Sequence, residues 1–405
     1  MASAGARVAV TGLGAIAAIG HDVSSLWAAC VAGRCGIRPI ANIPTERLSV
    51  RVAAEIAGFD PLAHLDKREV QLMDRAAQLA VVAAREAVAQ AGLPPLAEPH
   101  RAGVILGAAI GHDTLDLAFR QLYGEGASRV HPLTVPRGMP SASASHVSMA
   151  FGCRGPSFAT ASACASATHA IGQAFHMVRS GMLDVAITGG SDASLSVGVI
   201  KSWEGLRVLS PDVCRPFSRD RQGLVLGEGA AILVLEPWER AEARGAAILA
   251  EIVGFGMSAD AADLTAPDAT GAAWAMVAAL DDAGLAPADI GYVNAHGTGT
   301  RLNDRAEAAA LAHVFGPRAA QPHVSSSKAQ IGHCLGAGGA IELVLTIEAL
   351  RHGVIPPTIG FREPDPDCDI DCVPNAARPA AIAAALSNSF AFGGLNAVLA
   401  VRRAP

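Results

Sequence analysis

The chain has 405 residues and a net charge of −6, and 51% of its residues are hydrophobic but only 17% charged. Its length suggests two core units of roughly 150 to 200 residues each, and its negative charge argues against nucleic acid as the main partner. No run of about 18 apolar residues occurs, so we expect no membrane span. The first seven residues do not resemble a signal peptide, and the eight cysteines form no CxxC pair. We therefore expect a cytoplasmic protein with reduced thiols.

Short apolar runs and helix-like stretches alternate along the first half. Residues 6–11 predict a buried strand followed by a glycine turn. The alanine-rich stretch 74–90 has helical periodicity and ends at Gly92 before Pro94, which is a helix stop signal. Further on, the pattern predicts strands at 101–106, 185–188 and 231–235, and a helix from about Cys164 to Arg179.

The second half repeats this rhythm. It predicts strands at 250–255, 290–294 and 323–326, and helices at 270–283, 304–315 and 339–353. Alternating strands and helices are typical of α/β proteins, whose sheets are covered by helices. Two halves of like rhythm suggest a duplication, so we predict an N-terminal half over residues 1–250 and a C-terminal half over 251–405.

The first predicted strand leads into Gly12-Leu-Gly14-Ala-Ile-Ala17, which resembles the GxGxxA turn of dinucleotide-binding proteins. That fingerprint also needs an acidic residue about 20 positions later. The sequence there reads Val31-Ala-Gly-Arg34 instead. We therefore explain the two glycines by tight packing at a turn.

Cys164 stands among small residues where a strand is expected to turn into a helix. The positive end of a helix dipole stabilises a thiolate. Small neighbours allow a thioester to approach, and backbone N–H groups at such a turn can bind an oxyanion. The alternative is a buried structural cysteine, because free cysteines often behave as small hydrophobic residues.

Two histidines follow in separate segments. His296 lies at a strand end, and His333 lies five residues after Lys328. Each histidine alone could be held by the backbone of a turn, and Lys328 alone could be a surface lysine. One Cys with one His would suit a hydrolase, whereas two His beside a Lys favour neutral imidazoles that donate hydrogen bonds to a thioester carbonyl. No HxH or HxxxH spacing occurs, so we expect no metal site.

These three segments, in this order, resemble the β-ketoacyl-acyl carrier protein synthases of the thiolase superfamily. The resemblance covers essentially the whole chain, and further matching motifs lie at 152–156, 188–190, 215–218, 223–229 and 387–396. Cys-His-His is the pattern of the elongating class I and II synthases. Segments 201–204, 214–218 and 361–371 look most like the nodulation protein E branch and related specialised type II ketosynthases. The resemblance implies a thiolase-like α/β fold, in which two βαβ-type halves form a five-layer αβαβα arrangement.

The resemblance implies a two-stage reaction. Cys164 would take an acyl chain from the phosphopantetheine thiol of an acyl carrier protein, with backbone N–H groups of Cys164 and Phe392 as the oxyanion hole. His296 and His333 would then bind the thioester carbonyl of malonyl carrier protein. Carbon dioxide would leave, and the carbanion would attack the acyl-Cys164 thioester. Lys328 would support the His333 side.

The resemblance also assigns the residues around the reacting groups. Those that support the site would be Glu342 and Asp260, and those that contact the pantetheine would be Thr298 and Thr300. The acyl gate would consist of Ala391, Phe392 and Gly393, with Ala391 in place of a flexible glycine and Asp263 in place of a histidine on a loop that moves with the gate. The acyl pocket would be lined by Ile110, Thr134 and Trp203. Thr134 replaces an aromatic residue that reaches across the dimer.

The implied partner is an acidic acyl carrier protein, which would meet a basic patch at the tunnel mouth. Lys67, Arg68 and Arg207 match that patch, although they could equally be solvated surface charges. A C2 homodimer is implied, and a heterodimer with a chain-length-factor-like subunit stays open. No bound cofactor is expected. A non-catalytic partner subunit and a Cys hydrolase are the alternatives, and of the housekeeping and specialised lipid, polyketide or polyene pathways we favour the specialised one.

Overall fold

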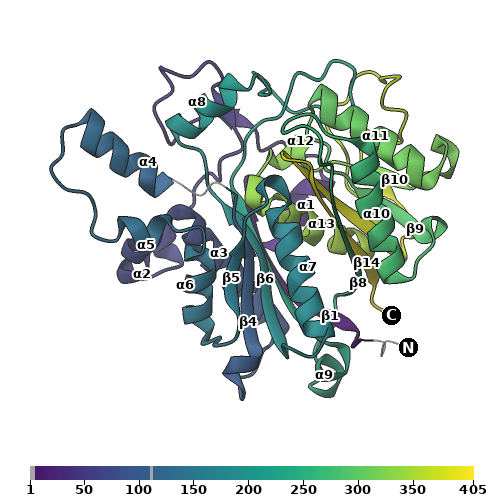
Figure 1. Cartoon of the computed structure of the whole chain (residues 1–405), viewed down its shortest axis with the longest axis horizontal. Coiled ribbons are helices and arrows are strands. Elements are labelled where there is room, and N and C mark those ends of the chain that lie inside the picture. The colour runs from purple at the N-terminus through teal and green to yellow at the C-terminus, as the bar shows by residue number, and fades with distance from the viewer. Residues whose placement is uncertain (1–4, 110–112) are drawn as a thin grey trace.

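The computed structural model describes residues 5–109 and 113–405 (Figure 1). Ten strands of the described chain join in one mixed sheet. Five come from the first half: β1 (Val8–Ala17), β4 (Ala102–Gly107), β5 (Ser157–Thr160), β6 (Val185–Asp192) and β7 (Gly229–Pro237). Five come from the second half: β8 (Ala250–Ala259), β9 (Ile290–Asn294), β10 (His323–Ser325), β13 (Ala384–Ala391) and β14 (Leu395–Arg403). Two small pairs add β2 (Arg38–Pro39) with β3 (Val52–Ala53), and β11 (Val354–Ile355) with β12 (Arg378–Pro379).

The two halves of the large sheet have the same strand order. Read outward from the middle, the first half runs β1-β7-β6-β4-β5 and the second half runs β8-β14-β13-β9-β10. In each half the two inner pairings are antiparallel and the two outer pairings are parallel. β1 and β8 join the halves through a short antiparallel pairing that begins with Val8 and Ile252. The α/β prediction is confirmed, while the division at residue 250 stays a prediction.

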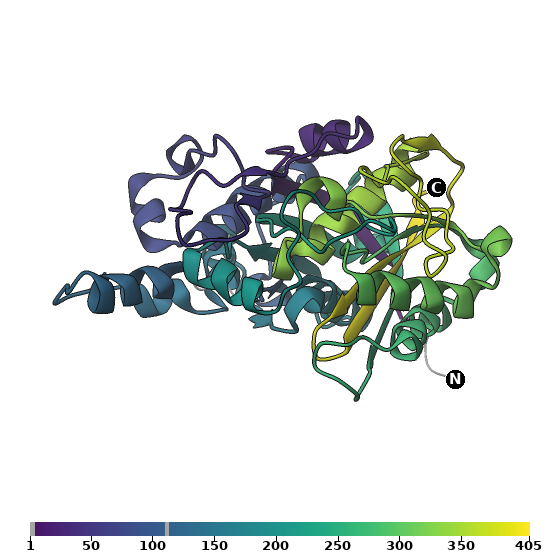
Figure 2. The ribbon, with the colours of Figure 1, turned by 90° about the horizontal axis from the view of Figure 1, so that it is seen from above.

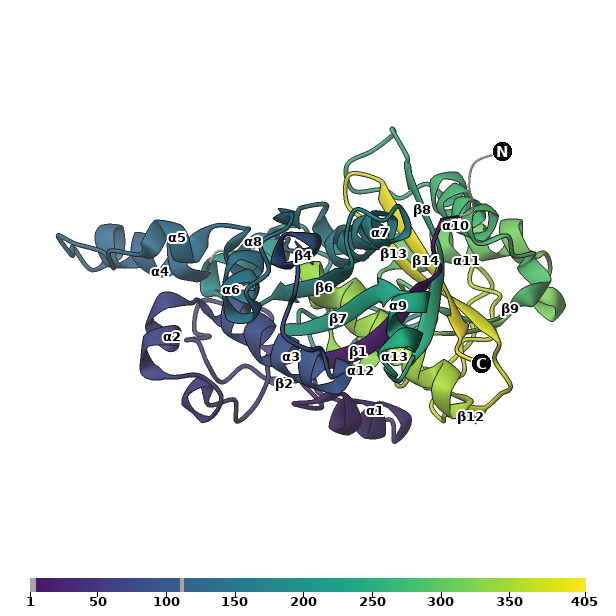
Figure 3. The same ribbon diagram turned by 90° about the horizontal axis from the view of Figure 1, so that it is seen from below.

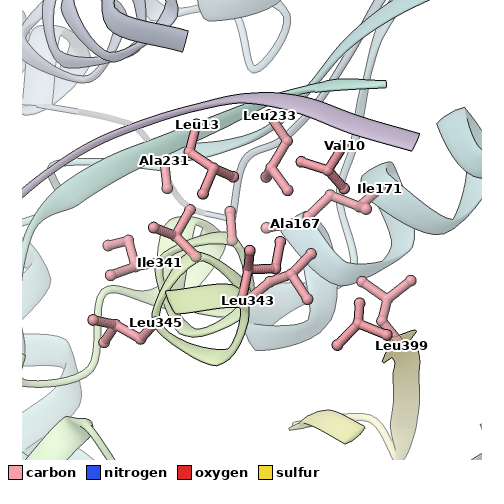
Figure 4. Packing of buried hydrophobic residues seen from close by; sticks show 14 of the residues in the cluster. Val10, Leu13, Ala167, Ile171, Ala231, Leu233, Ile341, Leu343, Leu345 and Leu399 are labelled. Carbon is pink, nitrogen blue, oxygen red and sulfur yellow. The ribbon is translucent and has the colours of Figure 1, made fainter. Parts of the chain in front are cut away.

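The helices of the described chain either pack on the two halves of the sheet or lie outside the layers so formed. They are α1 (Val23–Val31), α2 (Lys67–Leu72), α3 (Arg75–Ala91), α4 (Asp113–Phe119), α5 (Thr134–Gly138), α6 (Ala142–Phe151), α7 (Ser166–Arg179), α8 (Val197–Gly205), α9 (Trp238–Ala243), α10 (Ala269–Ala283), α11 (Arg301–Phe315), α12 (Lys328–Ile331) and α13 (Gly338–His352). α7 and α13 fill the space between the inner faces of the two halves (Figure 4). α3 and α6 cover the outer face of the first half, and α10 and α11 that of the second. This is the five-layer αβαβα arrangement that the resemblance implied.

β1 is longer than the sequence indicated, because Gly12 and Gly14 lie inside the strand. Figure 3 shows this strand beside β7 in the middle of the sheet. A Cβ atom would lie 2.0 Å from the carbonyl oxygen of Ala87 at Gly12, and 1.9 Å from that of Ala83 at Gly14. The predicted glycine turn is therefore wrong. Glycine is needed here because the backbone of α3 lies directly on the strand.

Local signals explain where the outer helices begin and end. The Asp74 carboxylate accepts the N–H of Ala77 at the start of α3, and Gly92 ends this helix with a left-handed backbone. Asp268 and Gly284 do the same for α10. Within the described ranges, no helix has the length and apolar character that a membrane crossing requires.

Candidate active site

Cys164 lies in a tight turn, Ala163–Ala165, between β5 and α7. Ala163 has a left-handed backbone with φ of 48°, which is strained for a residue with a Cβ atom. Gly107 of β4 makes room for this turn, since a Cβ there would lie 2.3 Å from the N atom of Ala167. Strain and close packing together hold the thiol at the start of the central helix.

The Cys164 thiol is buried, and its Sγ atom lies 3.0 Å from Nε2 of His333. Burial raises the pKa of this thiol to about 12, while Lys328 and the backbone N–H groups of Cys164 and Phe392 act in the opposite direction. Burial therefore outweighs the stabilisation of the thiolate that the sequence predicted from the helix N-terminus. The same two N–H groups are the ones that the resemblance assigned to the oxyanion hole.

His333 is held in one orientation by the backbone that follows it. The N–H of Leu335 donates to Nδ1 of His333 (3.3 Å), and Leu335 has a left-handed φ of 44°. Because Nδ1 accepts this hydrogen bond, the neutral ring carries its proton on Nε2, the atom that faces Cys164. Burial, followed by the charge of Lys328, lowers the pKa of His333 well below its usual range.

His296 follows β9 and is held by a buried carboxylate at its backbone and by Lys328 at its ring. The N–H groups of His296 and Gly297 donate to Glu307 (2.8 and 2.7 Å). Nδ1 of His296 lies 3.4 Å from Nζ of Lys328, which also donates to Glu342. Lysine has no acceptor, so His296 too carries its ring proton on Nε2. Burial, then Lys328, lowers the pKa of this histidine well below its usual range.

Glu307 was not predicted from the sequence. It lies on α11, and burial raises its pKa to about 7. Its carboxylate accepts the two successive backbone N–H groups of His296 and Gly297, one on each side of the His296 Cα atom. No local motif marks such a residue, because its partner is the main chain of another segment.

The structure brings Cys164, His296 and His333 together at one point. One ligand-type atom from each lies within 4.8 Å of the other two, and no other such group of Cys, His or carboxylates exists among the described residues. The two imidazole rings meet edge to face, with centroids 5.4 Å apart. All three residues line one cavity of about 360 Å³. This site can combine a nucleophile with two converging N–H donors.

The predicted pantetheine threonines lie on the wall of this cavity. Thr298 and Thr300 both line it, and their hydroxyl oxygens are 2.9 Å apart. Arg207 also lines it and is exposed, as predicted for a residue at the mouth. The sequence did not indicate three further polar lining residues: Gln222, Arg301 and Asn303.

Phe392 closes one side of the cavity. Its ring stacks on that of Trp203, with centroids 5.7 Å apart. Phe392 follows Ala391, the last residue of β13, and both residues line the cavity with Trp203. The predicted gate and one predicted pocket residue are therefore in direct contact.

The hairpin after Phe392 is hydrogen-bonded to the loop that contains Asp260 and Leu264. The N–H of Gly393 donates to the carbonyl of Leu264 (2.7 Å), and the N–H of Asp260 donates to that of Gly394 (2.9 Å). The Asp260 carboxylate accepts a hydrogen bond from Asn396 (2.6 Å). Asp260 thus joins the start of one loop to the end of the other.

Of the residues predicted for the acyl pocket and the basic patch, three described ones do not line the cavity: Lys67, Arg68 and Thr134. Thr134 is buried at the start of α5, where its hydroxyl donates to the carbonyl of His131 (2.7 Å). Lys67 and Arg68 lie on α2, whereas Arg207 lies just after α8. The two helices are separate in Figures 1 and 3. Within one chain, Arg207 alone of the predicted patch therefore reaches the cavity. Ile110 lies outside the described residues.

Two family models match the chain in succession. The β-ketoacyl synthase N-terminal domain matches residues 5–241, and the β-ketoacyl synthase C-terminal domain matches residues 249–362. Nodulation protein E of Rhizobium sp. (strain N33) is 48% identical over 98% of this chain and 99% of its own length. 3-Oxoacyl-[acyl-carrier-protein] synthase 2 of Staphylococcus aureus (strain COL) is 44% identical over 98% of each chain.

Solved structures agree with these relatives. The ishigamide ketosynthase/chain length factor superposes with a TM-score of 0.94 at 39% identity, covering 99% of this chain and 100% of that one. A type II polyketide synthase acyl-carrier protein in complex with its ketosynthase gives a TM-score of 0.89 at 30% identity, with the same coverage. The resemblance seen in the sequence is confirmed. This chain belongs to the β-ketoacyl synthase family and is an enzyme of the acyltransferase type.

Proposed function

We propose that this enzyme elongates acyl chains by decarboxylative condensation of malonyl carrier protein with an acyl group held on Cys164. The observation that carries the proposal is the pair of neutral imidazoles, whose Nε2–H groups converge on the cavity beside the thiol. Both rings have Nδ1 occupied by a donor. Two fixed N–H donors suit a developing enolate oxygen.

In the first stage the Cys164 sulfur adds to the thioester carbonyl of an acyl carrier protein. The N–H groups of Cys164 and Phe392 stabilise the tetrahedral oxyanion. The bond to the pantetheine sulfur breaks, and the proton from the Cys164 thiol goes to the departing thiolate. The enzyme is left as an acyl thioester.

In the second stage His296 and His333 donate to the thioester carbonyl of malonyl carrier protein. The carboxylate leaves as carbon dioxide, and its bonding electrons form an enolate whose oxygen accepts both N–H groups. The enolate carbon then attacks the acyl thioester, the C–S bond to Cys164 breaks, and the Cys164 thiolate takes up a proton from solvent. The product is a 3-oxoacyl carrier protein two carbons longer.

The same geometry disfavours a hydrolase. Hydrolysis needs a base that accepts a proton from water. Nε2 of His333 is the ring nitrogen beside Cys164, and it already carries the ring proton because Leu335 donates to Nδ1. The intact nucleophile also argues against a non-catalytic partner subunit.

The substrates proposed for this site are carrier-bound. Thr298 and Thr300 would contact the pantetheine arm and Arg207 the acidic carrier protein, and no bound cofactor is needed. Lys67 and Arg68 would contribute from outside the cavity mouth. A solved relative described as an acyl-carrier protein in complex with its ketosynthase supports this partner. The eight free cysteines fit the cytoplasmic setting proposed for the reaction.

A homodimer is the assembly that we propose. β5 is an edge strand of the large sheet, and α4, with the segment after it, projects from the body (Figure 2). That projection exposes apolar side chains: Leu117, Phe119 and Tyr123. A second copy, or a chain-length-factor-like subunit, would cover them.

We favour a specialised lipid or polyketide pathway, because relatives named nodulation protein E are 46–48% identical to this chain. Acyl choice would depend on Ile110, Thr134, Trp203 and Ala391. The deciding experiment is mass spectrometry of the enzyme with malonyl carrier protein and a panel of acyl carrier proteins. We expect an acyl adduct on Cys164 and a 3-oxoacyl product. Free acid without condensation product would overturn the proposal.

A further inference from the structure

The three reacting side chains are also the ligand types of a soft metal ion. Zinc sites combine Cys and His, and catalytic ones use three protein ligands with one open position. Zinc–ligand bonds of about 2.0–2.3 Å place tetrahedral ligands roughly 3.3–3.8 Å apart. Cys164, His296 and His333 are buried around a cavity, and one ligand atom of each lies within 4.8 Å of the others. Small side-chain shifts would bring these atoms to tetrahedral spacing.

The partners behind the two imidazoles oppose metal binding. A histidine that binds a metal through one nitrogen normally donates the N–H of its other nitrogen to a carboxylate, a carbonyl or water. Here Nδ1 of His333 faces the N–H of Leu335, and Nδ1 of His296 faces Nζ of Lys328. Both partners are donors, so each Nε2 carries a proton where a metal would need a lone pair.

We propose that Cys164, His296 and His333 form a latent soft-metal site, which Lys328 keeps closed by fixing the His296 tautomer. Lys328 acts as a positioning residue in this role. The N–H of Leu335 does the same for His333 and stays in every Lys328 variant. Removing Lys328 therefore frees His296, and His333 joins the ion only when the 3.3 Å hydrogen bond from Leu335 breaks. The cavity thus stays free for a thioester carbonyl, although its side chains would suit Zn²⁺.

Glu342 makes the effect of removing Lys328 specific. Nζ of Lys328 lies between Nδ1 of His296 and the Glu342 carboxylate and contacts both. In Lys328→Ala the vacated space can hold a water that accepts Nδ1–H and donates to Glu342. That arrangement resembles the carboxylate–histidine–zinc pattern. Lys328→Met removes the donor but fills the space with an apolar chain, so its effect should be smaller.

The test is titration of the full-length enzyme with Co²⁺ alone, followed through the cobalt–thiolate charge-transfer band, and with Zn²⁺ alone by calorimetry. We expect Lys328→Ala to bind either ion at least tenfold more tightly than the unmodified enzyme, since such partners alter metal affinity about 10–100-fold. Lys328→Met should lie between them. Adding Cys164→Ser to Lys328→Ala should abolish the cobalt band.

Two results would overturn the inference: equally tight binding by the unmodified enzyme, or no gain in both Lys328 variants. Circular dichroism checks that each variant is folded. If Lys328→Ala does not fold, the metal affinity of Lys328→Met decides the question. Because the readout is metal binding, the result does not depend on the proposed condensation.

Discussion

Each half of the molecule has a tight turn before its central helix, and the two turns have different roles in the site. In the first half the turn Ala163–Ala165 leads into α7, and in the second half the turn Leu335–Ala337 leads into α13. The first residue of each turn is strained, with φ of 48° and 44°. The first turn carries the nucleophile, whereas the second uses its N–H to orient His333.

This difference shows how a duplicated fold builds an asymmetric site. Both turns start a central helix between the two sheet halves, so they meet near the middle of the molecule. The first half supplies the sulfur that is to be acylated. The second half supplies His296, His333 and Phe392, whose N–H groups would stabilise the charge on oxygen in the proposed mechanism.

Removing the nucleophile of the first half should have the greatest consequence for activity. Cys164→Ala should lower condensation by roughly 10⁴-fold or more, as loss of a nucleophile does elsewhere. Decarboxylation of malonyl carrier protein should continue, because both imidazole donors remain. Product analysis measures the first reaction and carbon dioxide release the second. Loss of both activities to the same extent would contradict the division between the halves.

Removing one imidazole of the second half should have a smaller consequence. His333→Ala should slow decarboxylation about 10²–10³-fold, the usual cost of one lost oxyanion donor. Acylation of Cys164 should persist, since its proposed oxyanion hole is made of backbone N–H groups. Mass spectrometry of the acyl-enzyme checks this, and an unacylated variant would be evidence against separate roles.

The pH dependence separates the thiol from the imidazoles. With a pKa raised to about 12, the Cys164 thiolate fraction should rise tenfold per pH unit between pH 7 and 9. Alkylation by iodoacetamide should follow that rise without a plateau. Decarboxylation should stay constant as pH falls through 6.5, because both histidines have lowered pKa values and remain neutral. A plateau in alkylation below pH 9 would mean that the helix lowers the pKa of the Cys164 thiol more than burial raises it.

The smallest effect tests the repeat itself. Gly254 lies in β8 as Gly12 lies in β1: a Cβ would be 2.4 Å from Ala279 O in the first case and 2.0 Å from Ala87 O in the second. Gly12→Ala and Gly254→Ala should each reduce the free energy of unfolding by about 1–3 kcal/mol. Thermal unfolding compares them with Gly205→Ala, where a Cβ meets nothing within 4 Å. If only one of the two variants were destabilised, Gly12 and Gly254 would not have equivalent packing roles in the two halves.

The proposed catalytic residues were predictable because each stands in its own short motif. Cys164, His296, His333 and Lys328 were all recognised in this way, and the structure places them together. Metal ligation was dismissed on spacing along the chain. That reasoning was incomplete, because the three possible ligands come from three different segments.

What the sequence missed depends on contacts between distant segments. Gly12 and Gly14 were interpreted as a turn. Glycine is needed at these positions because the backbone of α3 packs directly on the strand, which the sequence does not show. Glu307 and the N–H of Leu335 act through the main chain, which leaves no trace in residue type. The strands β13 and β14 were read only as a motif, although they pair along their whole length.

In the proposed mechanism, one half accepts the acyl chain and the other activates malonyl carrier protein. The most direct measurement is parallel assay of acyl transfer and carbon dioxide release in Cys164→Ala and His333→Ala. We expect Cys164→Ala to release carbon dioxide but take no acyl group, and His333→Ala to take the acyl group but release almost no carbon dioxide. Any other pairing of the two losses would contradict this mechanism.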